Sequence, residues 1–132
     1  MSRHAFVLVG GPDVTLDDLV ALGERVLEGS FVPDGDGTLV LVMRGGAVAV
    51  NLSRHNITDD PEDDDDFFPS FEAHPYWFEV RDLDKNYGRQ MEIAREIFHA
   101  VVDEGRWRAF LSDDLQTLEA VYTPEDGLID YT

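Results

Sequence analysis

The apolar pattern of the first thirty residues predicts one strand and one helix. An apolar run rich in Phe and Val covers residues 5–9 and ends at Gly10-Gly11-Pro12, as a buried strand followed by a turn does. Thr15, with Asp18 three positions later, has the spacing of a helix capping box. Apolar residues then recur at helical spacing until Gly29, which favours the end of the helix.

The rest of the pattern predicts two hairpins, one further strand and a long helix. The first hairpin joins residues 38–43 to 47–52 through Arg44-Gly45-Gly46, whose glycines supply the positive φ angles of a tight turn. A turn at 33–37 precedes this hairpin. The second half of the chain predicts a strand at 76–81, a helix at 87–104 ended by Gly105, and a hairpin of 107–111 and 117–122 around 112–114.

The order strand, helix, strand, strand therefore occurs twice, in residues 4–52 and 74–122. This order predicts an α+β fold, a two-layer sandwich in which one mainly antiparallel sheet carries two helices on one face. The repeat is one of pattern, with little residue identity, and is consistent with a β-α-β-β duplication. The 132 residues fit a single domain, with residues 53–73 as an acidic linker loop on the surface.

A dense block of carboxylates interrupts the pattern between the two halves. Residues 59–66 contain one proline and the seven acids Asp59, Asp60, Glu62, Asp63, Asp64, Asp65 and Asp66, called the acidic tract below. Buried carboxylates need partners, and the neighbouring sequence offers none, so the tract must face water or a cationic partner. The net charge of the chain is −18, and removing the seven tract charges still leaves −11 spread over the rest.

This acidity bears on the partners of the chain. A strongly negative surface repels the phosphates of nucleic acid and of anionic membranes, so a basic protein is the expected partner. Lysine occurs once, at Lys85, beside nine arginines. Salt adaptation or a GC-rich genome would give the same composition without any acidic binding role, and this alternative stays open.

Six aromatic residues follow the acidic tract within twelve positions. Tyr76, Trp77 and Phe78 fall in a predicted strand, where alternate side chains should enter the core. Phe67, Phe68 and Phe71 precede that strand in a loop with Pro69, and we expect them to be anchors that contact a partner. The alternative is a loop that its own side chains pin down.

No motif in the chain indicates catalysis or a metal. The chain has no cysteine, which excludes disulfides and thiolate sites, and its four histidines lack metal-ligand spacing. Residues 34–39 resemble part of a calcium loop, but Val32 and Met43 stand where the first and last ligands belong. Gly10-Gly11 matches no phosphate-binding motif. We expect no enzyme activity, no cofactor and, since no signal peptide or apolar span is evident, a cytoplasmic protein.

A small, acidic, cysteine-free α+β chain resembles the immunity proteins of bacterial toxin systems, many of which neutralise a basic nuclease by covering it. The resemblance rests on size, acidity and layout. It implies a non-enzymatic inhibitor whose tract steers a basic toxin and whose aromatics hold it. The repeated β-α-β-β units are also similar to effector-binding and gyrase-inhibitor domains. These imply two alternatives: a small-molecule pocket lined by Tyr76, Trp77 and Trp107, or DNA mimicry. Oligomeric state is left open.

Overall fold

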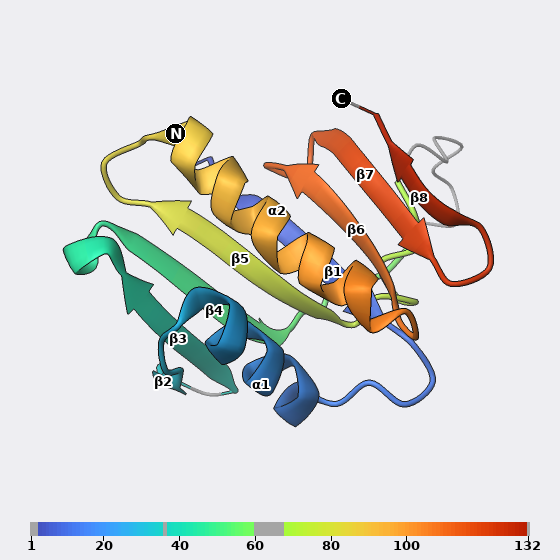
Figure 1. The fold of residues 1–132 in the computed structure, drawn as a ribbon, viewed down its shortest axis with the longest axis horizontal. Coiled ribbons are helices and arrows are strands. Elements are labelled where there is room, and N and C mark those ends of the chain that lie inside the picture. Colours follow the sequence, from blue (N-terminus) through green and yellow to red (C-terminus); the bar gives the residue numbers. More distant parts are fainter. Residues whose placement is uncertain (1–2, 36, 60–67, 132) are drawn as a thin grey trace.

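The computed structural model of the chain describes residues 3–35, 37–59 and 68–131. Within them, eight strands form one sheet and two α-helices pack against it (Figure 1). The helices are α1 (Leu16–Leu27) and α2 (Tyr87–Glu104), and a 3-10 turn spans Arg44–Gly46. The strands are β1 (Ala5–Gly10), β2 (Val32–Pro33), β3 (Thr38–Met43), β4 (Val48–Arg54), β5 (Tyr76–Asp82), β6 (Arg108–Asp113), β7 (Thr117–Thr123) and β8 (Gly127–Asp130).

The sheet is antiparallel throughout, in the order β2-β3-β4-β5-β1-β6-β7-β8. The first strand, β1, lies in the middle, hydrogen-bonded to β5 and β6. Every residue of β1 is buried, so both of its faces are covered. The α+β class and the antiparallel sheet predicted from sequence are confirmed.

The two predicted helices are also confirmed. The side chain of Thr15 accepts a hydrogen bond from the Asp18 amide and the Asp18 carboxylate accepts one from the Thr15 amide, which is the expected capping box. Helix α2 spans the predicted residues and stops at Gly105, whose φ of 72° lies in the left-handed region.

Four details of the predicted elements were wrong or incomplete. Ser53 and Arg54, predicted to begin the linker loop, belong to β4. The predicted turn at 33–37 begins with a short edge strand, because Val32 pairs with Val40. The tail after residue 123, for which no element is predicted from sequence, forms strand β8. Ser112 and Asp113 belong to β6, and the turn lies at Asp114–Gln116 instead.

The sheet topology gives no support to an internal duplication. Both β5 and β6 run antiparallel to β1, so α2 connects two strands that point the same way. The strand after α1, β2, also points the same way as β1, but β3, β4 and β5 lie between these two strands, whereas only β1 lies between β5 and β6. The two strand-helix-strand units therefore differ in geometry although their element order is the same.

Both helices cover one face of the sheet, called the helix face below (Figure 1). The inward stripe of α2, including Ile93, Ile97 and Phe98, packs with Leu19 and Leu22 of α1 against alternate residues of the strands. Phe78 of β5 and Phe98 have no exposed surface. Burial of such aromatic side chains supplies much of the stabilisation of a small domain.

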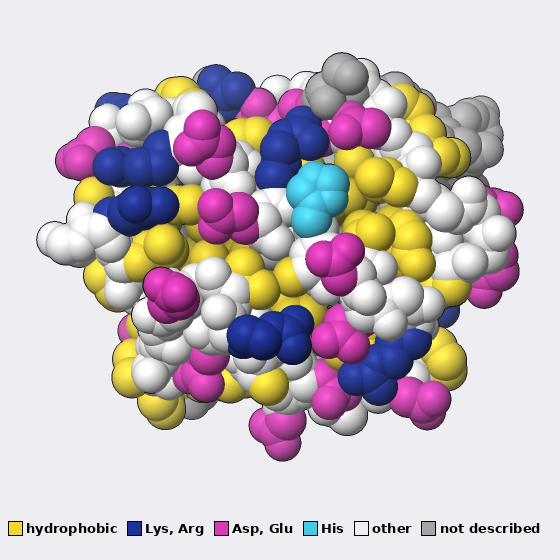
Figure 2. Space-filling model, viewed as in Figure 1, with side chains coloured by type: hydrophobic (Ala, Val, Ile, Leu, Met, Phe, Trp, Pro, Cys, Tyr) yellow, Lys and Arg dark blue, Asp and Glu magenta, His cyan; other side chains and the backbone are white. Residues whose placement is uncertain are grey.

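The outer surface of the helix side mixes both signs of charge (Figure 2). Acidic side chains lie between arginines there, and several arginines pair with them, as Arg25 does with Glu104 at 3.5 Å and Arg95 with Glu119 at 3.5 Å. Neither described helix is long and apolar enough to cross a membrane.

Candidate partner-binding surface

The face of the sheet opposite the helices, called the far face below, carries its own apolar row. Leu8 of β1 pairs with Trp77 of β5 on one side and with Phe110 of β6 on the other. The row continues from Phe110 through Val121 to Ile129. Because directly opposed residues of antiparallel strands point to the same face, these side chains form a band across five strands.

The chain that joins β4 to β5 crosses over this band. The apolar residues on this face form one group, called the far-face cluster. Its buried members are Phe6, Leu8, Phe110 and Leu118, and its half-buried members are Phe68, Phe71, Trp77, Leu115 and Val121. The ring of Phe71 meets that of Phe110 edge-on at 5.7 Å, and Phe68 lies 6.1 Å from Phe110. Two of the predicted partner anchors thus pack on the sheet and remain partly exposed.

Gly10 lets the crossing chain approach the sheet closely. A Cβ atom at Gly10 would lie 1.8 Å from the carbonyl oxygen of Ala73, which is closer than any real contact. The backbone of residues 73–74 therefore rests directly on β1. From sequence, Gly10 was assigned only to the turn that leads toward the helix, and this second role was missed.

Asp59 fastens the beginning of the acidic tract to the segment that follows it. Its carboxylate accepts a hydrogen bond from the hydroxyl of Ser70 at 2.5 Å and one from the amide of Phe71 at 2.8 Å. These hydrogen bonds, that of Ser70 first, hold the pKa of Asp59 below its usual range. Asp59, predicted to steer a partner, is therefore also a structural clamp.

Two histidines complete the attachment. His55 donates from Nε2 to the carbonyl of His74 at 2.5 Å and accepts at Nδ1 from the amide of Ile57 at 3.1 Å, which fixes its neutral tautomer. His74 donates from Nδ1 to the carbonyl of Ser70 at 2.7 Å. Burial lowers the pKa of His74 to about 4, so its ring is neutral at physiological pH.

These contacts bring the described residues on either side of residues 60–67 to one place. Asp59 leads into the tract, and Phe68 follows it two residues before Ser70, to which Asp59 is bonded. The remaining predicted site residues, Asp60, Glu62, Asp63, Asp64, Asp65, Asp66 and Phe67, lie outside the described residues. The described surface thus consists of half-buried aromatics, with Asp59 and Phe68, the described residues that flank 60–67, beside them.

The residues proposed for a small-molecule pocket do not meet. Trp107 is buried in the helix-face core, and Tyr76 packs against that core. Trp77 lies on the far face, 4.8 Å from the ring of Phe6. A pocket lined by all three is therefore wrong, because alternate residues of β5 point to opposite sides of the sheet.

The described residues contain no group of three or more histidine, aspartate and glutamate side chains that could hold a metal ion. Comparison of the chain with protein-family models, with curated proteins and with solved structures finds no match in any of the three. The function has to be argued from the surface itself.

Proposed function

We propose that this protein is a non-enzymatic binding module that covers a basic protein partner, as an immunity protein covers its toxin. The acidic tract steers the partner toward the far face, and the half-buried aromatics beside the tract make the contacts that hold it. A basic nuclease is the kind of toxin that fits this charge best.

The observation that carries the proposal is the juxtaposition of the far-face cluster with the described residues that flank 60–67. Phe68, Phe71 and Trp77 keep part of their surface exposed. Ile57, with 36% of its surface exposed, lines a hollow together with Phe71, and Ile129, with 46% exposed, pairs with Val121 of the cluster. Protein interfaces combine such apolar anchors with a polar rim. Here the rim is acidic, which selects for a cationic partner.

The negative charge of the chain raises the association rate constant more than it raises the affinity of the complex. Complementary charges raise association rates to about 10⁸ M⁻¹s⁻¹ or more at low salt, whereas uncharged surfaces give about 10⁵–10⁶. With a net charge of −18, the whole chain attracts a basic protein, and the tract adds a local concentration of seven carboxylates. The attachment of Asp59 and Phe68, which flank residues 60–67 in the chain, beside the far-face cluster supports an approach of the partner toward the far face.

A role as a DNA mimic is the variant of this proposal in which the basic partner is a nucleic-acid-binding protein. It predicts that double-stranded DNA competes with the chain for the partner. If the chain instead covers a toxin away from its nucleic-acid site, the toxin should bind DNA and the chain at the same time. Competition by DNA in the binding assay separates the two.

The test measures binding to the basic protein encoded beside this chain, because an immunity protein is encoded next to its toxin. The variant D63N/D64N/D65N/D66N should associate about tenfold more slowly at low salt, with a flatter salt dependence. The control variant D13N/E92Q/E96Q/D103N removes four exposed negative charges elsewhere. Three of these residues, Glu92, Glu96 and Asp103, lie on α2. The control should change the rate much less, although both variants have the same net charge.

The aromatic contacts have their own control. Phe68→Ala and Phe71→Ala should raise the dissociation rate by about tenfold or more, as buried interface anchors do. Leu128→Ala, at an exposed position that pairs with Tyr122 on the helix side of β8, should leave it unchanged. Equal slowing of association by the two four-charge variants would disprove steering by the tract, and unchanged dissociation in both phenylalanine variants would disprove contact at the far face.

A further inference from the structure

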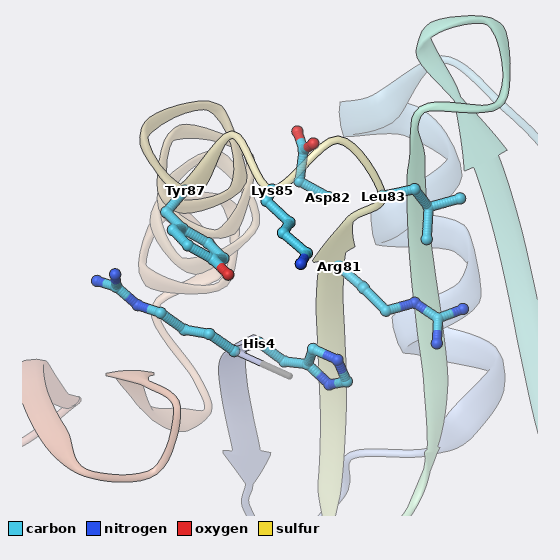
Figure 3. A pocket seen from close by; sticks show the side chains of 7 residues that line it. His4, Arg81, Asp82, Leu83, Lys85 and Tyr87 are labelled. Atoms are coloured by element: carbon cyan, nitrogen blue, oxygen red, sulfur yellow. The ribbon is translucent and has the colours of Figure 1, made fainter. Parts of the chain in front are cut away.

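A second feature lies at the end of the sheet where β1 begins, β5 ends and α2 starts. These elements enclose a hollow of about 340 Å³ (Figure 3). Its lining is unusual for so acidic a chain, consisting of Arg3, His4, Arg81, Asp82, Leu83, Lys85 and Tyr87. The volume falls at the lower end of the range of about 300–1,000 Å³ that small-molecule sites occupy.

The lining is positively charged. Three of the ten basic residues of the chain, including its single lysine, meet at this hollow. Asp82 is the acidic residue of the lining, and its carboxylate has no exposed surface and points away from Lys85 (Figure 3). It accepts hydrogen bonds from Arg89 Nε at 2.6 Å and from the amides of Asp84 and Asn86. A ligand in the hollow would therefore meet cations, while this carboxylate is already occupied.

Among the described residues, two of the three cations have no counter-ion. Arg3 is paired with Asp113 and lies over the ring of Tyr87 at 4.6 Å. Arg81 and Lys85, both exposed, make no ion pair with any residue that the structure describes. In a chain with 28 acidic residues, two neighbouring cations without a carboxylate partner keep two charges available for a ligand.

The loop that carries Lys85 is held firmly from inside. Gln90 of α2 is buried and accepts a hydrogen bond from the Asp82 amide at 2.8 Å, while its own amide donates to the Arg3 carbonyl at 3.0 Å. Lys85 adopts a left-handed conformation with φ of 59°, and its amide donates to the Asp82 carbonyl. A non-glycine residue in this region is uncommon and needs support from its surroundings. The base of the hollow is thus preorganised.

The side chains are arranged around Lys85. Its ammonium group points into the hollow, with the hydroxyl of Tyr87 beside it and the ring of His4 below (Figure 3). Arg81 leaves from the neighbouring strand end and extends along the rim away from Lys85, on the side of Leu83 (Figure 3). Tyr87 can donate a hydrogen bond and, with Leu83, offers apolar surface beside the charges.

We propose that this hollow binds the phosphate group of a small organic phosphate, with Lys85 and the Tyr87 hydroxyl as its ligands and with Arg81, whose exposed side chain turns in from the rim, as the second cation. A phosphate dianion matches two uncompensated cations, and the arginine fork can bind two of its oxygens at once. The apolar surface of Leu83 and Tyr87 accommodates the organic part. This site is independent of the far-face surface proposed above, because none of its residues belongs to the far-face cluster or to the acidic tract.

The test is a titration followed by NMR amide shifts and calorimetry, with phenyl phosphate as the probe. Saturable shifts should appear at residues 81–87. Lys85→Gln and Arg81→Gln should each weaken binding by about tenfold or more, since hydrogen bonds to charged groups contribute most. Arg44→Gln removes the same charge from an exposed position in the β3–β4 turn, outside this hollow, and should leave the affinity within about twofold.

Further probes separate the sources of the phosphate. Inorganic phosphate should bind more weakly than phenyl phosphate, and a short oligonucleotide should not bind more tightly than it. Equal weakening by Arg44→Gln and Lys85→Gln, or the lack of saturable shifts at 81–87, would overturn the site. Tighter binding of the oligonucleotide would overturn the small-molecule assignment. Thermal unfolding of each variant checks that the fold is intact. The variant D63N/D64N/D65N/D66N should not weaken phosphate binding, so failure of the phosphate site and failure of the proposed function can be told apart.

Discussion

The two faces of the sheet are covered in different ways. On the helix face, regular helices bury a continuous core that includes twenty-one buried apolar residues among those the structure describes. On the far face, a segment without regular structure covers four buried apolar residues and is attached by a glycine contact, two histidines and one aspartate. The first covering is specified by helical periodicity, and the second by individual contacts between residues far apart in the sequence.

Under the proposed function, the two faces have different tasks. A face closed by helices supplies most of the folding energy, because it removes large apolar side chains from water completely. A face closed by a loop keeps aromatic side chains half-buried at the surface, where a partner can cover the remaining area. Binding surfaces are commonly placed on loops that a rigid scaffold supports.

The largest expected effect contrasts one phenylalanine from each face. Phe78 has no exposed surface and packs among helix-face residues, so Phe78→Ala should lower the free energy of unfolding by about 4 kcal/mol. Phe71 is half-buried, so Phe71→Ala should cost about 1–2 kcal/mol. Urea unfolding of both variants measures the contrast. Equal losses would mean that the far face belongs to the same cooperative core and is no separate layer.

The next effect is the pH dependence that His74 brings to the far face. The pKa of His74 is about 4 in the folded chain against 6.5 for the free group, chiefly through burial, with Arg108 and His55 also lowering it and Asp59 raising it. The unfolded chain therefore binds more protons between pH 6.5 and about 4. Stability contributed by neutral His74 is complete above pH 6.5 and is lost as the pH falls toward 4, by up to about 3 kcal/mol.

The measurement compares the wild type with His74→Asn, in which the side-chain amide can still donate to the Ser70 carbonyl. The difference in unfolding free energy between the two chains should shrink or reverse from pH 7 to pH 4. The carboxylates common to both chains cancel in this difference. A difference that stays constant over this pH range would show that His74 does not lose its proton on folding.

The sequence predicted the helix face much better than the far face. The capping box at Thr15 and the stripe of α2 are local patterns, and both helices appear where they were expected. The neighbours of β1 and the docking of Phe68 and Phe71 on Phe110 depend on contacts between residues far apart in the sequence, which no local pattern encodes. The cationic hollow also escaped prediction, because Arg3 and Lys85 are distant in the sequence and meet only through the sheet.

The smallest expected effect tests the contact that seats the loop. In Gly10→Ala the new methyl group would overlap the Ala73 carbonyl, so either β1 or the segment 70–75 must move, at a cost of about 1–3 kcal/mol. Because β1 is fixed on both sides by β5 and β6, the loop should yield. Hydrogen exchange should then lose protection at the Phe71 and His74 amides, which donate to Asp59 and to the Phe71 carbonyl, while α2 keeps its own.

Gly88→Ala is the matched control for this substitution. Gly88 lies in the first turn of α2, and its added Cβ would meet only the Asn86 side chain, at an ordinary 3.7 Å. Alanine is the better helix former, so this variant should be equally stable or slightly more stable, with unchanged exchange at Phe71. If Gly10→Ala retained that protection, the strand would have moved in place of the loop. The far-face covering would then be as rigid as the helix layer, and the distinction between the two faces would rest on their shape alone.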